Sequence, residues 1–428
     1  MRTCVSKIYQ CYLAIIPCKV YLSLVEKYIA TSKSSKYYYQ KMKIGFITPF
    51  FTPIAGGSAV GTYNLARYLA RRGHEVFIFT SDFGRNLARF DYEKDVIIVE
   101  SKTKLKMLNV FYTPSLKSKL ENCDKLDVLH FHNFRTYQNY VAYNYAKKMN
   151  TPYVLQAHGS LPRAYSWQKL KWLYDELFGY KLLKNASKVI AFSNVEAEQY
   201  KAMGVPEEKI ATIPNGIDLS EYAELPPKGA FKKKFNIPED KKVILYLGRI
   251  HKIKGIDFLI RAYAILKNKM KFKDTILVIV GPDDGYLSEV RSLVQSLGIS
   301  RFVIFTGPLY GKDKLGAYVD SDVVVLPSRY ETFPNVVLEA YACSKPVVAS
   351  NVEAIPNIVL HGETGLLFQA GDVKELASAI AYMLTHPEEA ERMGCNARRL
   401  VEENFPIDRV VTQLEALYEQ VLKEKDKN

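Results

Sequence analysis

Long apolar runs are missing from this 428-residue sequence, and with them the clearest sign of a membrane-spanning helix. The nearest candidate, residues 8–30, is interrupted by Pro17, Lys19, Glu26 and Lys27. A signal peptide also fits poorly, because no apolar core leads to a small-residue cleavage site. The six cysteines form no CxxC pair and show no metal-ligand spacing. These absences favour reduced thiols and a cytoplasmic protein.

Two nucleotide-binding signatures are missing as well. No GxGxxG follows the first predicted strand, which argues against a dinucleotide-dependent oxidoreductase, and there is no GxxxxGK[ST] loop. The first turn carries only Gly56-Gly57-Ser58, ahead of a helical stretch predicted at 63–71. Glycines allow backbone amides to approach a phosphate or a sugar closely, although a plain tight turn explains the pair equally well.

The net positive charge is confined to the N-terminal half of the chain. Of the net charge of +14, residues 1–42 contribute +6 and residues 43–219 contribute +8, whereas residues 220–428 carry 28 basic and 28 acidic side chains. This field favours an anionic partner or an anionic membrane surface, with a solvated lysine-rich surface as the equal alternative. Residues 1–41 are either an interfacial amphipathic helix or, slightly favoured, a non-native extension upstream of Met42.

From Met42 onward, β-like runs alternate with helical stretches in two successive series, the pattern of doubly wound parallel sheets. Prolines and a glycine between the two series are typical of a linker. We predict an extension at 1–41, Rossmann-like domains at 42–219 and 231–405, and a closing helix with one apolar face at 406–428. Strands are predicted at 43–48, 75–80, 96–100, 127–131, 153–157 and 188–192, then at 242–247, 275–280, 302–305, 322–326 and 346–349.

The strongest chemical signal is a pair of glutamates, Glu331 and Glu339. Glu331 follows the predicted strand 322–326, and Pro334 suits the first turn of a helix that carries Glu339. Ligands of doubly wound sheets bind at the carboxyl ends of the strands. There, a carboxylate on a loop and another on a helix can hold different hydroxyls of one ligand. Two unrelated surface glutamates are the simpler alternative.

A second signal is Gly248-Arg249 at the end of a strand, followed by Lys254-Gly255. Arg249 and Lys254 can converge on a diphosphate, the arginine as a planar fork and the lysine as a point charge. The helix expected to start near Gly255 adds its N-terminal dipole. Such a site suits a nucleoside diphosphate that must leave, whereas two solvated cations are the simpler alternative.

Histidines follow or lie within the predicted strands of the N-terminal half. His158-Gly159 comes just after the strand 153–157, where an imidazole either polarises a sugar hydroxyl or serves a structural role. His130 and His132 alternate on another strand. Since no third ligand is evident nearby, we interpret both as core or cleft-lining side chains and predict no bound metal.

Taken together and in order, these motifs resemble the retaining glycosyltransferases of family 4. The resemblance runs from about Met42 to the C-terminus, and the ordered set is specific although no single member is. It implies the α/β GT-B fold, in which two Rossmann-like doubly wound domains face each other across a cleft and the last helix crosses back to the N-terminal domain. The motifs are Gly56-Gly57, His158-Gly159, Pro214-Asn215-Gly216-Ile217-Asp218, Gly248-Arg249 with Lys254-Gly255, Gly281-Pro282, Glu331 to Glu339, and Gly362-Glu363-Thr364-Gly365.

The resemblance also implies roles. Arg249, Lys254 and Gly57 would bind the diphosphate of a UDP- or GDP-sugar, which is the substrate, and no cofactor is expected. Glu339 would hold the ribose, while His158 and Glu331 are the predicted catalytic residues at the donor sugar. The remaining nucleotide and sugar contacts would come from Gly56, Asn215, Gly281, Pro282, Thr332, Phe333, Pro334 and Asn335, with the backbone of 306–309 near the base.

The sequence departs from the family at two places. Glu353-Ala354 stands where the family often has Gly-Gly, and Ser344 replaces a common glycine, which leaves the donor sugar open. A sugar-nucleotide 2-epimerase on the same fold and a non-catalytic binding scaffold are the alternative functions. The intact Arg249, Lys254 and both glutamates favour transfer to an acceptor.

The acceptor, a glycan or a lipid-linked molecule, is expected on the basic N-terminal domain, as in the family. Residues 167–188 combine lysines with the apolar side chains of Trp172, Leu173, Leu177, Phe178, Leu182 and Leu183. We hypothesise a membrane-surface helix here, which would hold a cytoplasmic protein at the inner face of an anionic membrane. An ordinary packed helix is the alternative. No nucleic-acid partner is expected.

Overall fold

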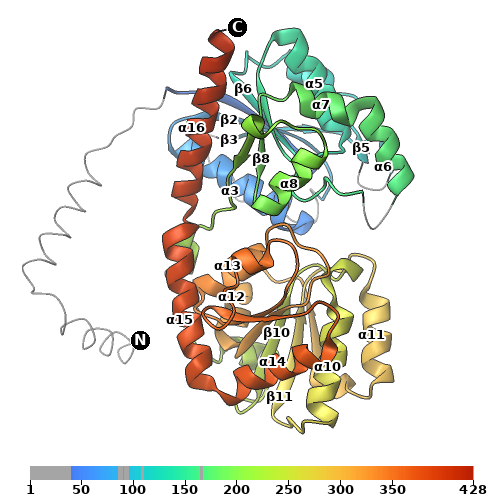
Figure 1. Cartoon of the computed structure of the whole chain (residues 1–428), viewed down its shortest axis with the longest axis vertical. Coiled ribbons are helices and arrows are strands. Elements are labelled where there is room, and N and C mark those ends of the chain that lie inside the picture. The colour runs from blue at the N-terminus through green and yellow to red at the C-terminus, as the bar shows by residue number, and fades with distance from the viewer. Residues whose placement is uncertain (1–39, 85–89, 91–95, 108–109, 164–166, 428) are drawn as a thin grey trace, which may run out of the picture. The chain divides into compact units, whose positions relative to one another are not determined.

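A computed structural model describes residues 40–84, 90, 96–107, 110–163 and 167–427. Residues 1–39 lie outside this range, so both interpretations of the N-terminal extension stay predictions. Every helix in the described part of the chain is too short or too polar to span a lipid bilayer. From Met42 onward the chain builds two large parallel sheets flanked by helices (Figure 1).

The N-terminal sheet has seven parallel strands in the order β3-β2-β1-β6-β7-β8-β9. They are β1 (Lys43–Ile47), β2 (Glu75–Ser81), β3 (Val96–Ser101), β6 (Val128–His132), β7 (Tyr153–Gln156), β8 (Lys188–Ala191) and β9 (Ile210–Thr212). A separate antiparallel hairpin joins β4 (Leu105–Met107) to β5 (Val110–Tyr112). The helices are α3 (Gly57–Arg71), α4 (Leu116–Glu121), α5 (Tyr137–Met149), α6 (Gln168–Tyr174), α7 (Tyr180–Asn185) and α8 (Asn194–Ala202).

The C-terminal sheet has six parallel strands in the order β12-β11-β10-β13-β14-β15. They are β10 (Lys242–Leu247), β11 (Thr275–Val280), β12 (Val303–Gly307), β13 (Val323–Leu326), β14 (Val347–Ser350) and β15 (Gly365–Phe368). The helices are α9 (Ala230–Lys234), α10 (Ile256–Asn268), α11 (Leu287–Ser296), α12 (Gly311–Asp320), α13 (Asn335–Ala342), α14 (Val373–Thr385), α15 (Pro387–Asn404) and α16 (Ile407–Asp426).

All eleven predicted strands are present, with ends that shift by one or two residues. Nine of them carry apolar runs that are almost entirely buried in parallel sheets, whereas the edge strands β3 and β12 are partly exposed but still have apolar runs that are recognisable in the sequence. The edge strands β9 and β15 and the hairpin β4–β5 were missed. β9 has three residues and β15 begins with Gly365, so neither has the long β-branched or aromatic run that identifies a strand.

Two local predictions were wrong. Helix α3 begins at Gly57 rather than near Tyr63, with Gly56 as its N-cap. Pro334 is the N-cap of α13 rather than part of its first turn, because its φ of −85° and ψ of 89° are not helical. The helix predicted within residues 167–188 is present from Gln168 to Asn185, with a π-helical turn (Asp175–Gly179) between α6 and α7.

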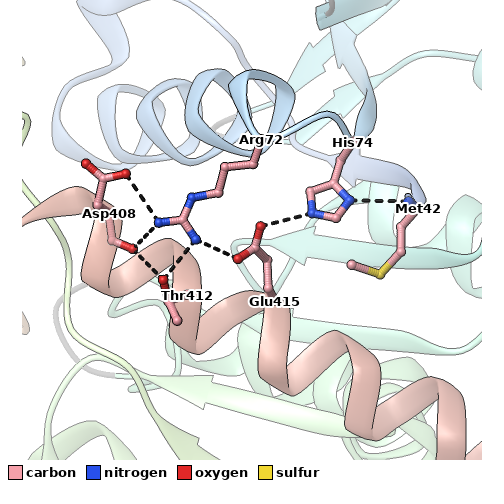
Figure 2. A network of polar contacts seen from close by, with 6 residues as sticks. All are labelled: Met42, Arg72, His74, Asp408, Thr412 and Glu415. Atoms are coloured by element: carbon pink, nitrogen blue, oxygen red, sulfur yellow. Dashed lines mark hydrogen bonds and ion pairs between the residues drawn. The ribbon is translucent and has the colours of Figure 1, made fainter. Parts of the chain in front are cut away.

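The last helix, α16, packs on the N-terminal domain, as the family resemblance implied. Its predicted apolar face shares one core with β1 and α3 through Val410, Val411, Leu414, Leu417, Tyr418 and Val421. Figure 2 shows the polar part of this contact, in which the fully buried Glu415 lies 2.6 Å from Arg72 and 3.0 Å from His74. The Met42 amide donates to His74 Nδ1 at 3.2 Å, so the imidazole proton sits on Nε2 and points at Glu415.

Candidate active site

The candidate residues lie at the carboxyl edges of the two sheets. In the C-terminal sheet, β11 and β12 lie on one side of β10, whereas β13 to β15 lie on the other side. The strand order therefore reverses between β10 and β13, and this topological switch point is where doubly wound sheets bind ligands. Arg249 follows β10 and Glu331 follows β13, so both belong to the loops at the switch point.

Lys254 and Glu331 form an ion pair at this switch point. Lys254 ends a 3-10 turn (Lys252–Lys254), and the next residue, Gly255, has a φ of +64°. A Cβ on Gly255 would overlap the carbonyl oxygen of Pro327, so only glycine fits there. Both charged side chains are shielded, with exposed fractions of 18% and 13%. The predicted diphosphate-binding cation therefore lies beside the predicted sugar-binding carboxylate, and their charges balance.

Arg249 is more open to solvent, with 45% of its side chain exposed, and it pairs with Asp284 at 2.5 Å. Its loop is fixed by a close approach between two strand ends. Gly281 has a φ of +147°, and a Cβ there would overlap the carbonyl oxygen of the residue before Arg249. The Ile250 amide also donates to the Pro282 carbonyl at 2.8 Å. The predicted Gly281-Pro282 segment therefore lies directly against the arginine loop.

Glu339, on α13, is engaged by two residues that the sequence analysis missed. Lys314 donates to one carboxylate oxygen at 3.0 Å, and the Tyr318 hydroxyl donates to the other at 2.8 Å. Burial opposes the charge on Lys314, but the neighbouring Glu339 carboxylate raises the pKa of this lysine. The two contacts fix the carboxylate in place, and each oxygen keeps acceptor capacity for a ligand hydroxyl.

The glycine turn of the N-terminal domain reaches this set of residues. A Cβ on Gly56 would lie 3.6 Å from the Arg249 side chain, and one on Gly57 would lie 3.1 Å from the amide nitrogen of Asn335. Asn335 donates to the Gly57 carbonyl at 3.3 Å, and Asn215 donates to Asn335 at 2.9 Å. The two domains thus meet through backbone and side-chain amides.

His158 lies in the turn after β7 and has a φ of +52°. Its Nε2 lies 2.8 Å from Nδ1 of His132, which also lies 3.2 Å from the Thr62 hydroxyl. Thr62 donates its own proton to the Ser58 carbonyl, so we assign the shared proton to His132 Nδ1 and the remaining one to His158 Nδ1. Burial lowers the pKa of His158 to about 3, so its ring is uncharged at neutral pH.

His130 and His132 are fully buried on β6, with their rings stacked at 4.2 Å, which confirms the core interpretation. Burial lowers the pKa of His130 to about 3, and burial together with the neighbouring histidines puts that of His132 well below its ordinary value. His130 also bonds the Tyr418 hydroxyl of α16 at 2.7 Å. Across the described ranges, no group of three or more acidic, cysteine or histidine side chains is arranged to hold a metal.

The loop after Glu331 touches the N-terminal domain at two further points. Gly159 has a φ of +74°, and a Cβ there would overlap the side chain of Thr332. The Phe333 ring lies 5.7 Å from that of Phe192, which in turn lies 5.1 Å from the His158 ring. The histidine turn and the glutamate loop are therefore in direct contact.

The two departures from the family pattern fall on unusual backbone positions. Glu353 has a φ of +46° and Ser344 a φ of +56°, a region that glycine occupies at lower cost. The amide after Glu353 donates to the Glu331 carbonyl at 3.4 Å. The first of these positions, Glu353, is therefore followed directly by a residue that is hydrogen-bonded to the loop that carries Glu331.

Comparisons with known proteins agree with this arrangement. Two family models match in tandem, Glycosyltransferase Family 4 over residues 55–221 and Glycosyl transferases group 1 over residues 227–400. N-acetyl-alpha-D-glucosaminyl L-malate synthase from Bacillus anthracis is 31% identical over 91% of this chain and 99% of its own length. The chain belongs to glycosyltransferase family 4. A D-inositol 3-phosphate glycosyltransferase from Kineococcus radiotolerans is 28% identical over 81% of this chain and 86% of its own length.

Solved structures place this family 4 glycosyltransferase in the GT-B fold. Sucrose-phosphate synthase from Thermosynechococcus elongatus matches with a TM-score of 0.74 and 25% identity, over 90% of this chain and all of the other. Anabaena HepE, solved with UDP and glucose, matches with a TM-score of 0.73 and 20% identity, over 89% of this chain and all of the other.

Several residues of this glycosyltransferase site were not found from the sequence. Asp284, Lys314 and Tyr318 pair with predicted residues but lie far from them along the chain, so no spacing rule links them. Glu196 was also missed, although the run Ser193-Asn194-Val195-Glu196 has the form of a helix-capping box.

Proposed function

We propose that this glycosyltransferase moves a sugar from a UDP- or GDP-sugar to a glycan, lipid-linked or small anionic acceptor, with retention at the anomeric carbon. The observation that carries the proposal is the placement of Arg249 and Lys254 on one loop at the switch point. A departing nucleoside diphosphate develops negative charge, and fixed cations at the point of departure stabilise the transition state. The glycine turn at Gly56 lies beside Arg249 and adds backbone amides.

The pairing of these cations supports the same role. Lys254 is balanced by Glu331 and Arg249 by Asp284. An incoming diphosphate offers the cations new partners, and Glu331 is then available to the hydroxyls of the donor sugar. Glu339 is proposed to hold the ribose, with the backbone at Gly281-Pro282 and 306–309 beside the base. His158, as an uncharged imidazole, is proposed to donate its Nδ1 proton in a hydrogen bond to the sugar.

A donor and acceptor screen tests this proposal. The full chain is incubated with UDP-glucose, UDP-N-acetylglucosamine, UDP-galactose or GDP-mannose, with and without L-malate, D-inositol 3-phosphate, short glycans or a glycolipid in vesicles. We expect nucleoside diphosphate release from one donor, stimulated by one acceptor, with the product keeping the donor's anomeric configuration. Donor turnover that needs no acceptor would instead indicate the 2-epimerase, and donor binding without any turnover would indicate a scaffold.

The acceptor side also has an exposed apolar surface rimmed by lysines, which we call the lysine-rimmed surface. Its apolar members are Leu105, Met107 and Tyr112 of the hairpin, and Trp167, Leu170, Trp172, Leu173, Leu177 and Phe178 around α6. Aromatic contacts join the two parts through α5, since Tyr112 lies 5.0 Å from Tyr137 and Tyr140 lies 4.8 Å from Phe178. Figure 1 shows β5, α5 and α6 at the same end of the N-terminal domain.

We propose that an anionic lipid surface covers this region and presents the acceptor. The exposed lysines at 102, 104, 106, 169 and 181 complement an anionic headgroup layer, and the tryptophans suit its interface. Leu182 and Leu183, which the original hypothesis included, are buried in the domain core instead. The buried Asp175 accepts from Arg135 and Arg163, and Arg135 also binds the Leu161 carbonyl, so the surface is tied to the turn that follows His158.

Vesicle flotation tests the lipid partner. We expect the chain to float with vesicles that contain phosphatidylglycerol, to float less at high salt, and to stay unbound with phosphatidylcholine alone. Replacing Trp172 and Leu173 by serine should abolish flotation, whereas Met270→Ser, an exposed methionine on the other domain, should leave it unchanged. Absence of flotation, or a dimer that the double replacement dissociates, would contradict a lipid surface as the partner.

A further inference from the structure

One buried carboxylate has no role in the proposed transfer. Glu196 lies in the first turn of α8 and exposes none of its surface. Among the described residues, no lysine or arginine forms an ion pair with it, unlike the other site carboxylates. A buried charge without a cation is expensive unless hydrogen bonds compensate it, so its contacts need an explanation.

Both oxygens of Glu196 accept hydrogen bonds from the backbone. The amide of Gly159 donates to Oε1 at 2.8 Å, and the amide of Phe192 donates to Oε2 at 2.8 Å. Ser193 caps the same helix by accepting from the Glu196 amide at 3.4 Å. The side chain therefore joins the end of β8 to the turn after β7, two segments separated by more than thirty residues.

The turn that Glu196 holds is the turn that carries His158. Gly159 presses against Thr332, the residue after Glu331, so any shift of this turn moves both the histidine and its contact with the glutamate loop. The helix of Glu196 touches that loop as well, because Gln199 bonds the Tyr330 hydroxyl at 3.3 Å. One helix thus contacts both halves of the candidate site.

We propose that Glu196 is a positioning residue whose ionised carboxylate holds the His158-Gly159 turn against the Glu331 loop, and whose protonation loosens the turn and slows transfer. This inference rests on the proposed function for its effect on transfer. Its effect on the turn does not depend on that function. An ionised carboxylate offers acceptors to both amides, whereas a protonated one carries a hydroxyl in place of one acceptor and loses one of the two bonds.

The electrostatic surroundings place the switch in the physiological range. Burial raises the pKa of Glu196 to about 7, although the bonds from Phe192 and Gly159 hold it back. The titratable groups that face it are Tyr200 of its own helix, Tyr330 of the opposite loop and His158 of the held turn. Burial raises the pKa values of both tyrosines and lowers that of His158, so all three are uncharged near neutral pH. The carboxylate is then the group that titrates.

Hydrogen exchange of the unmodified chain tests the turn directly, without reference to catalysis. We expect the amide of Gly159, followed in peptides spanning 153–162, to be more protected at pH 8 than at pH 6 after correction for intrinsic rates. The variant Glu196→Gln should show the low protection at both values, because its amide group presents N–H to one of the two donors. Equal protection of the unmodified chain at both pH values would overturn the proposal.

Kinetics then test the consequence for transfer. Glu196→Gln should lower kcat on the order of 10- to 100-fold and remove the fall in rate below pH 7, since small displacements of a reacting group cost that much. Glu196→Asp, which can still ionise, should keep a pH-dependent rate at an intermediate level. The control Glu198→Gln alters an exposed glutamate of the same helix and should keep both the rate and its pH dependence.

UDP binding separates this inference from the proposed function. Glu196 does not touch Arg249 or Lys254, so Glu196→Gln should bind UDP within about threefold of the unmodified chain by calorimetry. Normal UDP binding and an unchanged kcat in this variant would overturn the positioning role. If the expected exchange pattern appears but no sugar donor is used, the proposed transfer fails and the pH-sensitive turn stands.

Discussion

The two domains contribute different kinds of residue to the candidate site, charged on one side and uncharged on the other. On the C-terminal side, the charges are present but compensated, through the pairs Arg249–Asp284, Lys254–Glu331 and Lys314–Glu339. On the N-terminal side, the site is built from glycine backbone, Asn215 and the uncharged His158. Yet the N-terminal half of the sequence carries the whole net charge of the protein.

This difference has a physical reason. Cations that must meet a diphosphate are needed before the ligand arrives, and a shielded cation is tolerated only when a carboxylate lies beside it. Hydroxyl groups of a sugar need donors and acceptors rather than charge, and neutral imidazole and amide groups supply both. On the proposed function, the charged groups of the C-terminal domain would meet the diphosphate and, through Glu331 and Glu339, the hydroxyls of the donor, whereas the N-terminal domain would add uncharged donors such as His158.

The largest expected effect is on the donor side. Lys254→Ala should lower the rate of transfer on the order of 10²- to 10³-fold, because it removes a fixed cation from the developing charge. The exposed Lys233→Ala on α9 is the matched control and should change little. In steady-state kinetics, a double variant Lys254→Ala/Glu331→Gln that regained activity would show that the ion pair has only a structural role.

Substitutions at the contact between α16 and the N-terminal domain should lower the stability of the protein rather than its rate of transfer. Glu415→Ala leaves the buried His74 and the partly exposed Arg72 without their carboxylate, and should lower the free energy of unfolding by about 3 kcal/mol. Glu419→Ala on the same helix removes a surface pair with Lys423 and should cost no more than about 0.5 kcal/mol. Urea unfolding measures both, and equal losses would mean that the buried network contributes nothing special.

A smaller effect is expected at the ribose carboxylate. Glu339→Gln keeps the shape of the side chain but removes the charge that Lys314 balances, and should weaken UDP binding about tenfold. The exposed Glu391→Gln serves as the control. Calorimetric titration with UDP decides the question, and unchanged affinity would remove Glu339 from the nucleotide site.

An effect of similar size, but on the pH dependence of stability, concerns the neutral histidines. Because the folded pKa of His130 is about 3, below its ordinary value of 6.5, the folded state resists its protonation. The stability linked to neutral His130 is present above about pH 6.5 and is lost as the pH falls towards 3. His130→Gln removes this titration, so unfolding free energies at pH 7 and pH 5 should differ by about 1–2 kcal/mol less in the variant than in the parent. Identical pH dependence would mean that His130 is not held neutral.

Much of this protein follows from the sequence alone. Short apolar runs, most of them buried, identified eleven strands, and the order of short motifs identified the family and the GT-B fold. These features are local, because a buried strand needs a run of neighbouring apolar residues, and a strand-end turn is likewise formed by residues that are adjacent in the sequence. The strands that were not predicted, β9 and β15, lie at sheet edges, where a long apolar run is not needed.

Only the tertiary structure decided which partner each site residue has. The carboxylate Glu196 reaches Gly159, Lys314 reaches Glu339, and Thr332 lies against Gly159, through contacts between residues that are distant in sequence. The pKa values follow from the same packing, because burial and neighbouring charges have no signature along the chain. The sequence by itself therefore determined the architecture and the residue types at the strand ends, whereas folding determined which of them are charged, which are neutral, and which are held in place.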